Sequence, residues 1–154
     1  MKHEEIKSHI APVLAIFCAG DVHNSFDEST NTVWFNIDGK DAYPLLARGG
    51  DALTSLNYLA NKMLEKKLSE TGSNIRVVID ANGFEKKKID NLKTVAHMMA
   101  ERARYFKSSI DIDPMSPRDR KIVHEFLSTM SDIKTESVGE GPKRHIVIKY
   151  TGGI

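Results

Sequence analysis

The most informative stretch of this chain begins Pro114-Met115-Ser116-Pro117-Arg118-Asp119-Arg120-Lys121-Ile122-Val123-His124. Ser followed by Pro is a favoured N-cap and first-turn pair, so the sequence predicts a helix that begins at Ser116. Arg120 and His124 are four residues apart and would therefore share one face of that helix. The apolar residues at helical spacing would form its buried stripe, and they are Ile122, Val123, Phe126 and Leu127.

A second informative stretch follows it, Thr135-Glu136-Ser137-Val138-Gly139-Glu140-Gly141-Pro142-Lys143-Arg144-His145. Its Gly-Pro pair predicts a turn that leads into a β-rich end at 145–148. Arg and His donors gathered on a small rigid domain suit phosphate groups. We therefore expect the cationic residues of both stretches to converge on one surface: Arg118, Arg120, Lys121, His124, Lys143, Arg144 and His145.

Together these stretches resemble the R-3-H domain, a module that binds single-stranded nucleic acid and is named for an Arg and a His separated by three residues, here Arg120 and His124. The bare spacing occurs often by chance, but the long flanking match is specific. It is similar to the bacterial Jag family, whose members pair a KH domain with an R-3-H domain. The resemblance covers about residues 30–149. Jag proteins often carry a further N-terminal domain, and the residues before 30 are too few to form one.

The KH half of the resemblance rests on residues 33–40 and 51–59. KH domains clamp a single-stranded backbone with a Gly-x-x-Gly loop between two helices. The corresponding residues here are Ala47-Arg48-Gly49-Gly50, so alanine replaces the first glycine. Ala47 adds a Cβ and resists a positive φ. We therefore expect a weakened clamp, in which Arg48, Gly49 and Gly50 still contact the strand.

The pattern of apolar residues and turn residues predicts an α+β protein with two domains. The first, residues 1–82, is expected to be a KH domain of the prokaryotic α-β-β-α-α-β type. The second, residues 83–154, is expected to be a small α-β-α-β-β R-3-H domain packed against it, with the boundary at Asn82-Gly83. The expected helices are 3–19, 41–47 (broken by Pro44), 51–68, 84–107 and the one from Ser116, and the expected strands are 21–28, 32–38, 75–80, 109–113, 133–138 and 144–150.

Composition places the chain among globular proteins of the cytoplasm. It has 154 residues, of which 40% are hydrophobic and 28% charged. No apolar run approaches the roughly 20 residues that span a membrane. The apolar stretch at 10–19 contains Pro12 and follows acidic residues, so we interpret it as a core helix and not as a signal peptide. The single cysteine, Cys18, fits a reducing compartment.

The distribution of charge is more informative than its total of +1. Residues 1–83 hold 8 Lys+Arg and 11 Asp+Glu, which gives −3, and residues 84–154 hold 14 and 10, which gives +4. Affinity for phosphate requires local positive charge. The sequence therefore places the main nucleic-acid surface in the second half.

Catalysis and metal binding have little support in the sequence. It contains no nucleophile elbow and no phosphate-binding loop of the nucleotide-hydrolase type. His3, His9, His23 and His97 show no metal-ligand spacing. We expect a protein that is not an enzyme and that holds no cofactor and no metal.

The sequence thus predicts a cytoplasmic regulatory protein that binds single-stranded RNA, with single-stranded DNA as the second choice. The Jag resemblance implies a bacterial source and a role in RNA metabolism. His124 would either contact the ligand or orient Arg120. The alternative is an adaptor whose acidic KH half docks a partner, such as another KH protein, and a hydrolase is the third interpretation.

Overall fold

The computed structural model describes residues 3–18 and 22–152. Contacts between residues divide the chain into two compact units, Met1–Lys86 and Lys87–Ile154. Each unit has a three-stranded sheet and its own apolar core, so the protein is a mixed α+β structure. The predicted boundary between residues 82 and 83 stays a prediction.

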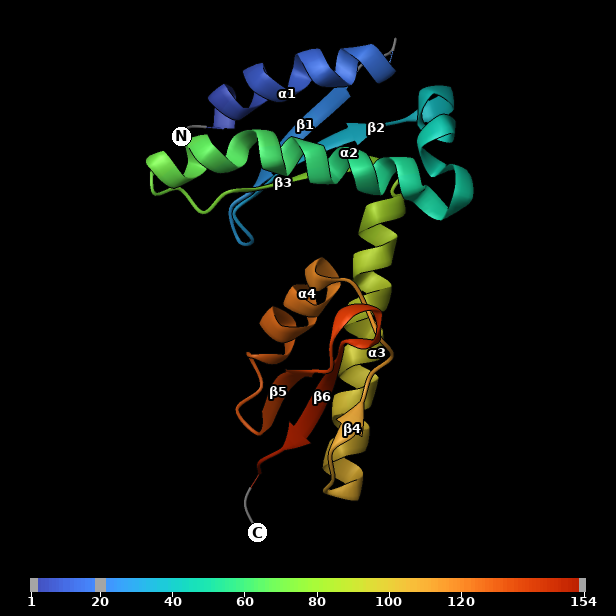
Figure 1. Cartoon of the computed structure of the whole chain (residues 1–154), viewed down its shortest axis with the longest axis vertical. Coiled ribbons are helices and arrows are strands. Elements are labelled where there is room, and N and C mark those ends of the chain that lie inside the picture. Colours follow the sequence, from blue (N-terminus) through green and yellow to red (C-terminus); the bar gives the residue numbers. More distant parts are fainter. Residues whose placement is uncertain (1–2, 19–21, 153–154) are drawn as a thin grey trace. The chain divides into compact units, whose positions relative to one another are not determined.

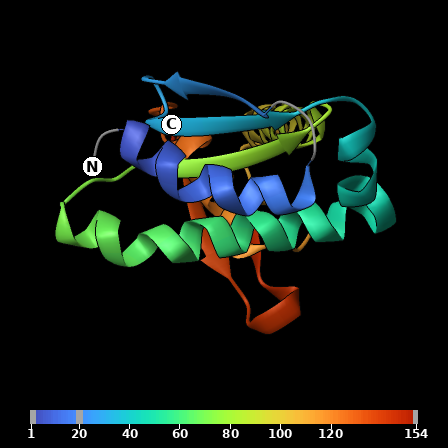
Figure 2. The ribbon, with the colours of Figure 1, turned by 90° about the horizontal axis from the view of Figure 1, so that it is seen from above.

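The first unit has the element order helix, strand, strand, helix, helix, strand. Its strands pair in the order β1-β2-β3, with β1 antiparallel and β3 parallel to β2. The helices α1 and α2 lie on the same face of this sheet (Figures 1 and 2). The elements are α1 (His3–Phe17), β1 (Val22–Asp27), β2 (Thr32–Ile37), η1 (Gly39–Ala42), α2 (Tyr43–Glu70) and β3 (Arg76–Ala81).

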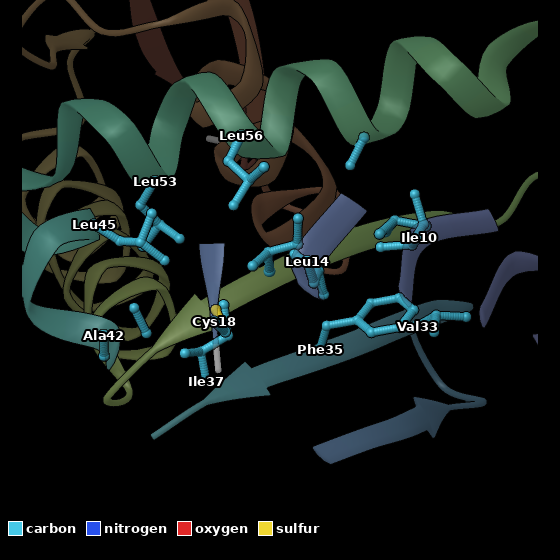
Figure 3. Close-up of a cluster of buried hydrophobic side chains, with 14 of the residues drawn as sticks. Ile10, Leu14, Cys18, Val33, Phe35, Ile37, Ala42, Leu45, Leu53 and Leu56 are labelled. Carbon is cyan, nitrogen blue, oxygen red and sulfur yellow. The ribbon is translucent and has the colours of Figure 1, made fainter. Parts of the chain in front are cut away.

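The core of the first unit lies between β2 and the two helices (Figure 3). Alternate residues of β2 point into it, because successive side chains of a strand face opposite sides. Phe35 is its largest fully buried side chain. Apolar residues at helical spacing give α1 and α2 one apolar face each, and both faces pack into this core. The buried side chains include Val33, Phe35 and Ile37 of β2, Ile6, Ile10 and Leu14 of α1, and Leu53, Leu56 and Leu64 of α2.

The helix α2 is interrupted as the sequence predicts, but not at Pro44. Pro44 lies in the first turn, where the missing N–H costs nothing, so the expectation that it breaks the helix is wrong. The interruption falls at residues 47–50, whose backbone leaves the helical region. Helical geometry resumes from residue 51 and continues to Glu70, two residues beyond the predicted end. The predicted end of the first helix, at residue 19, lies outside the described residues.

Two asparagines of α2 cover the outer edge of β3. The side-chain amide of Asn57 donates to the carbonyl of Ile79 and accepts from its N–H, both at 2.8 Å. One turn further along, Asn61 makes the same pair of bonds to Val77, at 2.8 and 3.2 Å. These amides satisfy backbone groups that an edge strand would otherwise leave open. A ligand therefore cannot pair with the backbone N–H and carbonyl groups of Val77 and Ile79.

The second unit has a sheet of order β4-β6-β5 in which neighbouring strands are antiparallel. Its core joins alanines of α3 to apolar side chains of α4 and of the three-stranded sheet, so both helices cover one face. Strands β5 and β6 start within one residue of their predicted positions. The elements are α3 (Phe84–Phe106), β4 (Ile110–Asp111), α4 (Pro117–Leu127), β5 (Ile133–Val138), η2 (Gly141–Lys143) and β6 (His145–Tyr150).

A bidentate ion pair fixes the end of α3 to the loop before β5. The Nε and Nη2 atoms of Arg104 lie 2.6 and 2.7 Å from the two carboxylate oxygens of Asp132. This contact holds the pKa of Asp132 below its usual range, chiefly through the hydrogen bonds from Arg104. Among the described residues, no helix is both long and apolar enough to cross a membrane.

Candidate functional site

A basic groove lies on the second unit between the start of α4 and the turn before β6. It has a volume of about 520 Å³. Arg120 comes from α4 and Arg144 from the end of the η2 turn, so two separate elements supply its cations. None of its described lining residues is acidic, and they are Pro114, Met115, Ser116, Pro117, Arg120, Gly141, Pro142 and Arg144. We call this hollow the basic groove.

The start of α4 is built as the sequence predicts. Ser116 has an extended backbone, and its Oγ accepts a hydrogen bond from the N–H of Asp119 at 3.2 Å. Pro117 follows in the first turn. The N–H groups at the start of a helix also favour a negatively charged ligand. The cap thus places the positive end of α4 beside Arg120 in the basic groove.

Arg120 is held in place by the segment that precedes its helix. Its Nη1 donates to the carbonyl oxygen of Met115 at 2.7 Å. This bond uses one of the five N–H donors of the guanidinium. The Met115 N–H in turn bonds to the carbonyl of Arg144 at 3.4 Å. The two arginines are therefore linked through the backbone of Met115.

Two hydroxyl groups on β5 hold residues of the predicted site. Thr135 and Ser137 are two residues apart on one strand and so lie on the same face of the sheet. The Oγ1 of Thr135 is 2.7 Å from Nδ1 of His124, and Oγ of Ser137 accepts from Nε of Arg144 at 3.0 Å. Neither residue is among the site residues predicted from the sequence. The signal that could have identified them is their spacing of two residues along a predicted strand, which places both side chains on one face.

His124 is half-buried, and its charge state follows from its surroundings. Burial lowers the pKa of the imidazole, and the nearby Arg120 guanidinium lowers it further. Both effects oppose a second positive charge next to Arg120. His124 is therefore neutral at pH 7, with Nδ1 engaged by Thr135. It is not a lining residue of the basic groove.

The other predicted cations are not among the lining residues of the basic groove. Arg118 is half-buried. Lys121 is exposed and lies 3.8 Å from the carboxylate of Glu125. Lys143 is exposed in η2, and its carbonyl accepts a hydrogen bond from Nδ1 of His145 at 3.0 Å. The structure thus brings Arg120 and Arg144 into one hollow and leaves these four residues outside its lining.

Comparison with known proteins now identifies this unit. The R3H domain family matches residues 90–150, which include all seven residues predicted for the basic surface of the second unit. The chain is 34% identical over 134 residues to RNA-binding protein KhpB of Bacillus subtilis (strain 168), and 31% identical over 134 residues to the protein of that name from Clostridium symbiosum. The chain contains an R3H domain and is homologous to KhpB (Jag) over most of its length.

These matches cover 86% and 87% of the chain, but only 63% and 59% of the two relatives. The KhpB of Streptococcus pneumoniae serotype 2 is 29% identical over 124 residues, which are 80% of this chain and 37% of that relative. The resemblance to the Jag family predicted from the sequence is confirmed. The chain spans about three fifths of the length of the first two relatives.

The loop at residues 47–50 of the first unit has a different geometry from the one expected. Ala47 has φ −57° and ψ 148°, which any residue adopts, so the expectation that its Cβ opposes the loop backbone is wrong. The left-handed residues are Arg48, Gly49 and Gly50, with φ of 53°, 70° and 85°. Arg48 and Gly49 are exposed, whereas Gly50 is buried. A Cβ on Gly50 would lie 2.7 Å from Cε1 of Phe84, so Phe84 supports the loop from below.

Proposed function

We propose that this protein binds single-stranded RNA, with the strand docked in the basic groove of its R3H domain. The observation that carries this proposal is that Arg120 and Arg144, from separate elements, line one groove without a carboxylate among its described walls. Guanidinium groups suit phosphate because their planar donors form paired, charge-assisted bonds. The relatives named RNA-binding protein KhpB support RNA as the ligand.

The proposed mechanism requires no covalent chemistry. Phosphate oxygens of the strand accept hydrogen bonds from the free donors of both guanidinium groups, near the positive end of α4. Binding releases counterions from the strand, so affinity falls as salt rises. Neutral His124 contributes to the site by fixing α4 against β5 through Thr135. On this proposal the protein regulates RNA in the bacterial cytoplasm.

We also propose that the first unit is a KH domain of the prokaryotic type. Its helix and strand order and the loop between the two parts of α2 support this assignment. Exposed Arg48 and Gly49 would contact the backbone of the strand. The edge of β3 adds nothing to this contact, because Asn57 and Asn61 occupy its backbone groups. The first unit therefore guides the strand, and the basic groove provides most of the affinity.

The test of RNA binding is a salt titration with a fluorescent single-stranded oligoribonucleotide. If about four phosphates are engaged, log K against log salt should have a slope near −3, at roughly −0.7 per phosphate. Arg144→Ala should weaken binding about tenfold and reduce the slope by about one phosphate. Arg102→Ala removes an equal charge from an exposed position on α3 outside the groove and is the matched control. Equal effects of the two substitutions, or binding that ignores salt, would refute the proposal.

A second candidate function is that of an adaptor whose first unit docks a partner protein. The observation that favours it is an apolar patch on α2, where Tyr58, Leu59 and Met63 are 63, 53 and 50% exposed. Exposed apolar patches often mark protein contacts. Leu59→Lys with Met63→Lys would abolish partner capture on this reading. On the RNA-binding reading the same double variant keeps its affinity for RNA.

A further inference from the structure

A second hollow adjoins the basic groove on the same unit. It has a volume of about 310 Å³, near the lower end of the range for pockets that hold small molecules. Apolar side chains form most of its surface, and polar side chains form the rest. Its lining residues are Lys88, Asn91, Leu92, Val95, Ile112, Asp113, Pro114, Met115 and Asp119. We call this hollow the apolar pocket.

Only one short segment separates the two hollows. Pro114 and Met115 line both of them. A ligand that lies in the basic groove therefore needs to extend only across this segment to reach the apolar pocket. In a single-stranded nucleic acid, the neighbour of each phosphate is a sugar that carries a base, and an unpaired base is free to turn into such a pocket.

The charges of the two hollows differ in sign. The basic groove has two arginines and no carboxylate among its described lining residues. The apolar pocket has two carboxylates, Asp113 and Asp119, against one cation, Lys88, which lies 3.8 Å from Asp119. A phosphate is repelled from such a pocket. A neutral, flat, largely apolar group with hydrogen-bonding edges fits it.

We propose that the apolar pocket binds the base of a nucleotide whose phosphate lies in the basic groove, and that it prefers a base with an exocyclic amine. This inference rests on the proposed function of the groove. Val95, Leu92 and Met115 would contact the faces of the base, and the thioether of Met115 is suited to a π system. The carboxylate of Asp113 only accepts hydrogen bonds, so it pairs with an amine and repels a carbonyl oxygen.

Asn91 adds a group that fits a base edge of this kind. Its exposed side chain lines the pocket and makes no hydrogen bond to another residue in the described parts of the chain. An amide offers a donor and an acceptor side by side, which matches the paired groups of a base edge. Cytosine and uracil provide the cleanest comparison, because they differ chiefly by an amine in place of a carbonyl oxygen.

The experiment compares oligocytidylate with oligouridylate of equal length by fluorescence anisotropy, on the full chain at fixed salt. The wild-type protein should bind oligocytidylate roughly tenfold more tightly. Asp113→Asn should bring this ratio close to one, because an amide also donates to a carbonyl oxygen. Asp111→Asn removes the same charge two residues away, outside the pocket, and should leave the ratio unchanged.

A further variant tests the apolar wall. Val95 is 40% exposed, so Val95→Gln should fold normally while it weakens binding of both oligonucleotides severalfold. The salt dependence should stay at its wild-type slope, since no phosphate contact is lost.

Equal affinity for the two oligonucleotides, or a preference that survives Asp113→Asn, would refute the proposal that the apolar pocket binds a base. In either case a normal salt slope would leave the basic groove in place as the binding site. If the wild-type protein shows no salt-dependent binding at all, both the proposed RNA binding in the basic groove and the proposed base binding in the apolar pocket are wrong.

Discussion

His124 on α4 and Thr135 on β5 are joined at 2.7 Å, between Nδ1 of the imidazole ring and Oγ1 of the hydroxyl. The contact fixes the helix that carries Arg120 against the sheet that carries the Arg144 contact, Ser137. The histidine of the Arg-x-x-x-His spacing is thus half-buried and bonded to β5 through this ring nitrogen. Its neighbour Arg120 is one of the two arginines that line the basic groove.

Stability should fall as the pH decreases through the ordinary pKa of histidine, about 6.5. The folded state lowers the pKa of His124, so the unfolded state binds more protons in this range. The associated stability is complete above pH 6.5 and is lost on acidification toward the lowered pKa. Denaturant titrations from pH 7.5 to 5.5 should show this loss in the wild type. His124→Gln should flatten the curve, and an unchanged slope would assign the effect to other groups.

Gly50→Ala should destabilise the first unit more than Gly49→Ala. Both positions have a left-handed backbone, which costs a non-glycine residue about 1–2 kcal/mol. The added Cβ at Gly50 also meets Phe84, whereas the one at Gly49 meets nothing within 4 Å. Overpacking adds typically about 1–3 kcal/mol. Urea denaturation measures the difference, and equal losses would show that Phe84 moves aside freely.

Arg120→Ala should weaken RNA binding more than Arg48→Ala. Arg120 lines the basic groove and also braces Met115 between the two hollows, whereas Arg48 lies on an exposed loop of the acidic half. A charge-assisted hydrogen bond contributes about 1.5–3 kcal/mol, so a loss of tenfold or more is expected for Arg120. Anisotropy titrations at one salt concentration give the ranking. The reverse order would make the first unit the main binding surface.

Asn57→Leu should cost about 1–3 kcal/mol for each backbone group of Ile79 that it leaves unpaired. Asn57 is 4% exposed and bonds both groups of Ile79, which is itself fully buried. Asn24→Leu, on the exposed strand β1, is the matched control and should have a small effect. Hydrogen exchange at the Ile79 amide should also become faster. A loss no greater than that of the control would show that water replaces the asparagine.

The sequence alone predicts the order of the elements and most of their bounds. The Ser116-Pro117 start of α4 and the strand at 133–138 follow from local signals, namely a cap, a fixed proline φ and alternation along a strand. It also identified Arg120 and Arg144 as members of one basic set, because both lie in stretches of recognisable pattern. Pro44 shows the limit of this reasoning. A proline is tolerated in the first turn of a helix but breaks the helix further along, and the sequence does not show in which turn Pro44 lies.

Which of the predicted cations line one groove depends on contacts between segments that are far apart in the chain. Arg120 and Arg144 are 24 positions apart in the chain, and the turn before β6 and the bond through Met115 bring them together. The roles of Thr135 and Ser137 depend on which strand face α4 covers, which no local pattern specifies. The loop at 47–50 likewise could be understood only from its backbone angles. They show that the position that requires glycine is 50, where Phe84 packs against the backbone, and not 47. Contacts between distant segments create these relations, so they emerge only when the chain has folded.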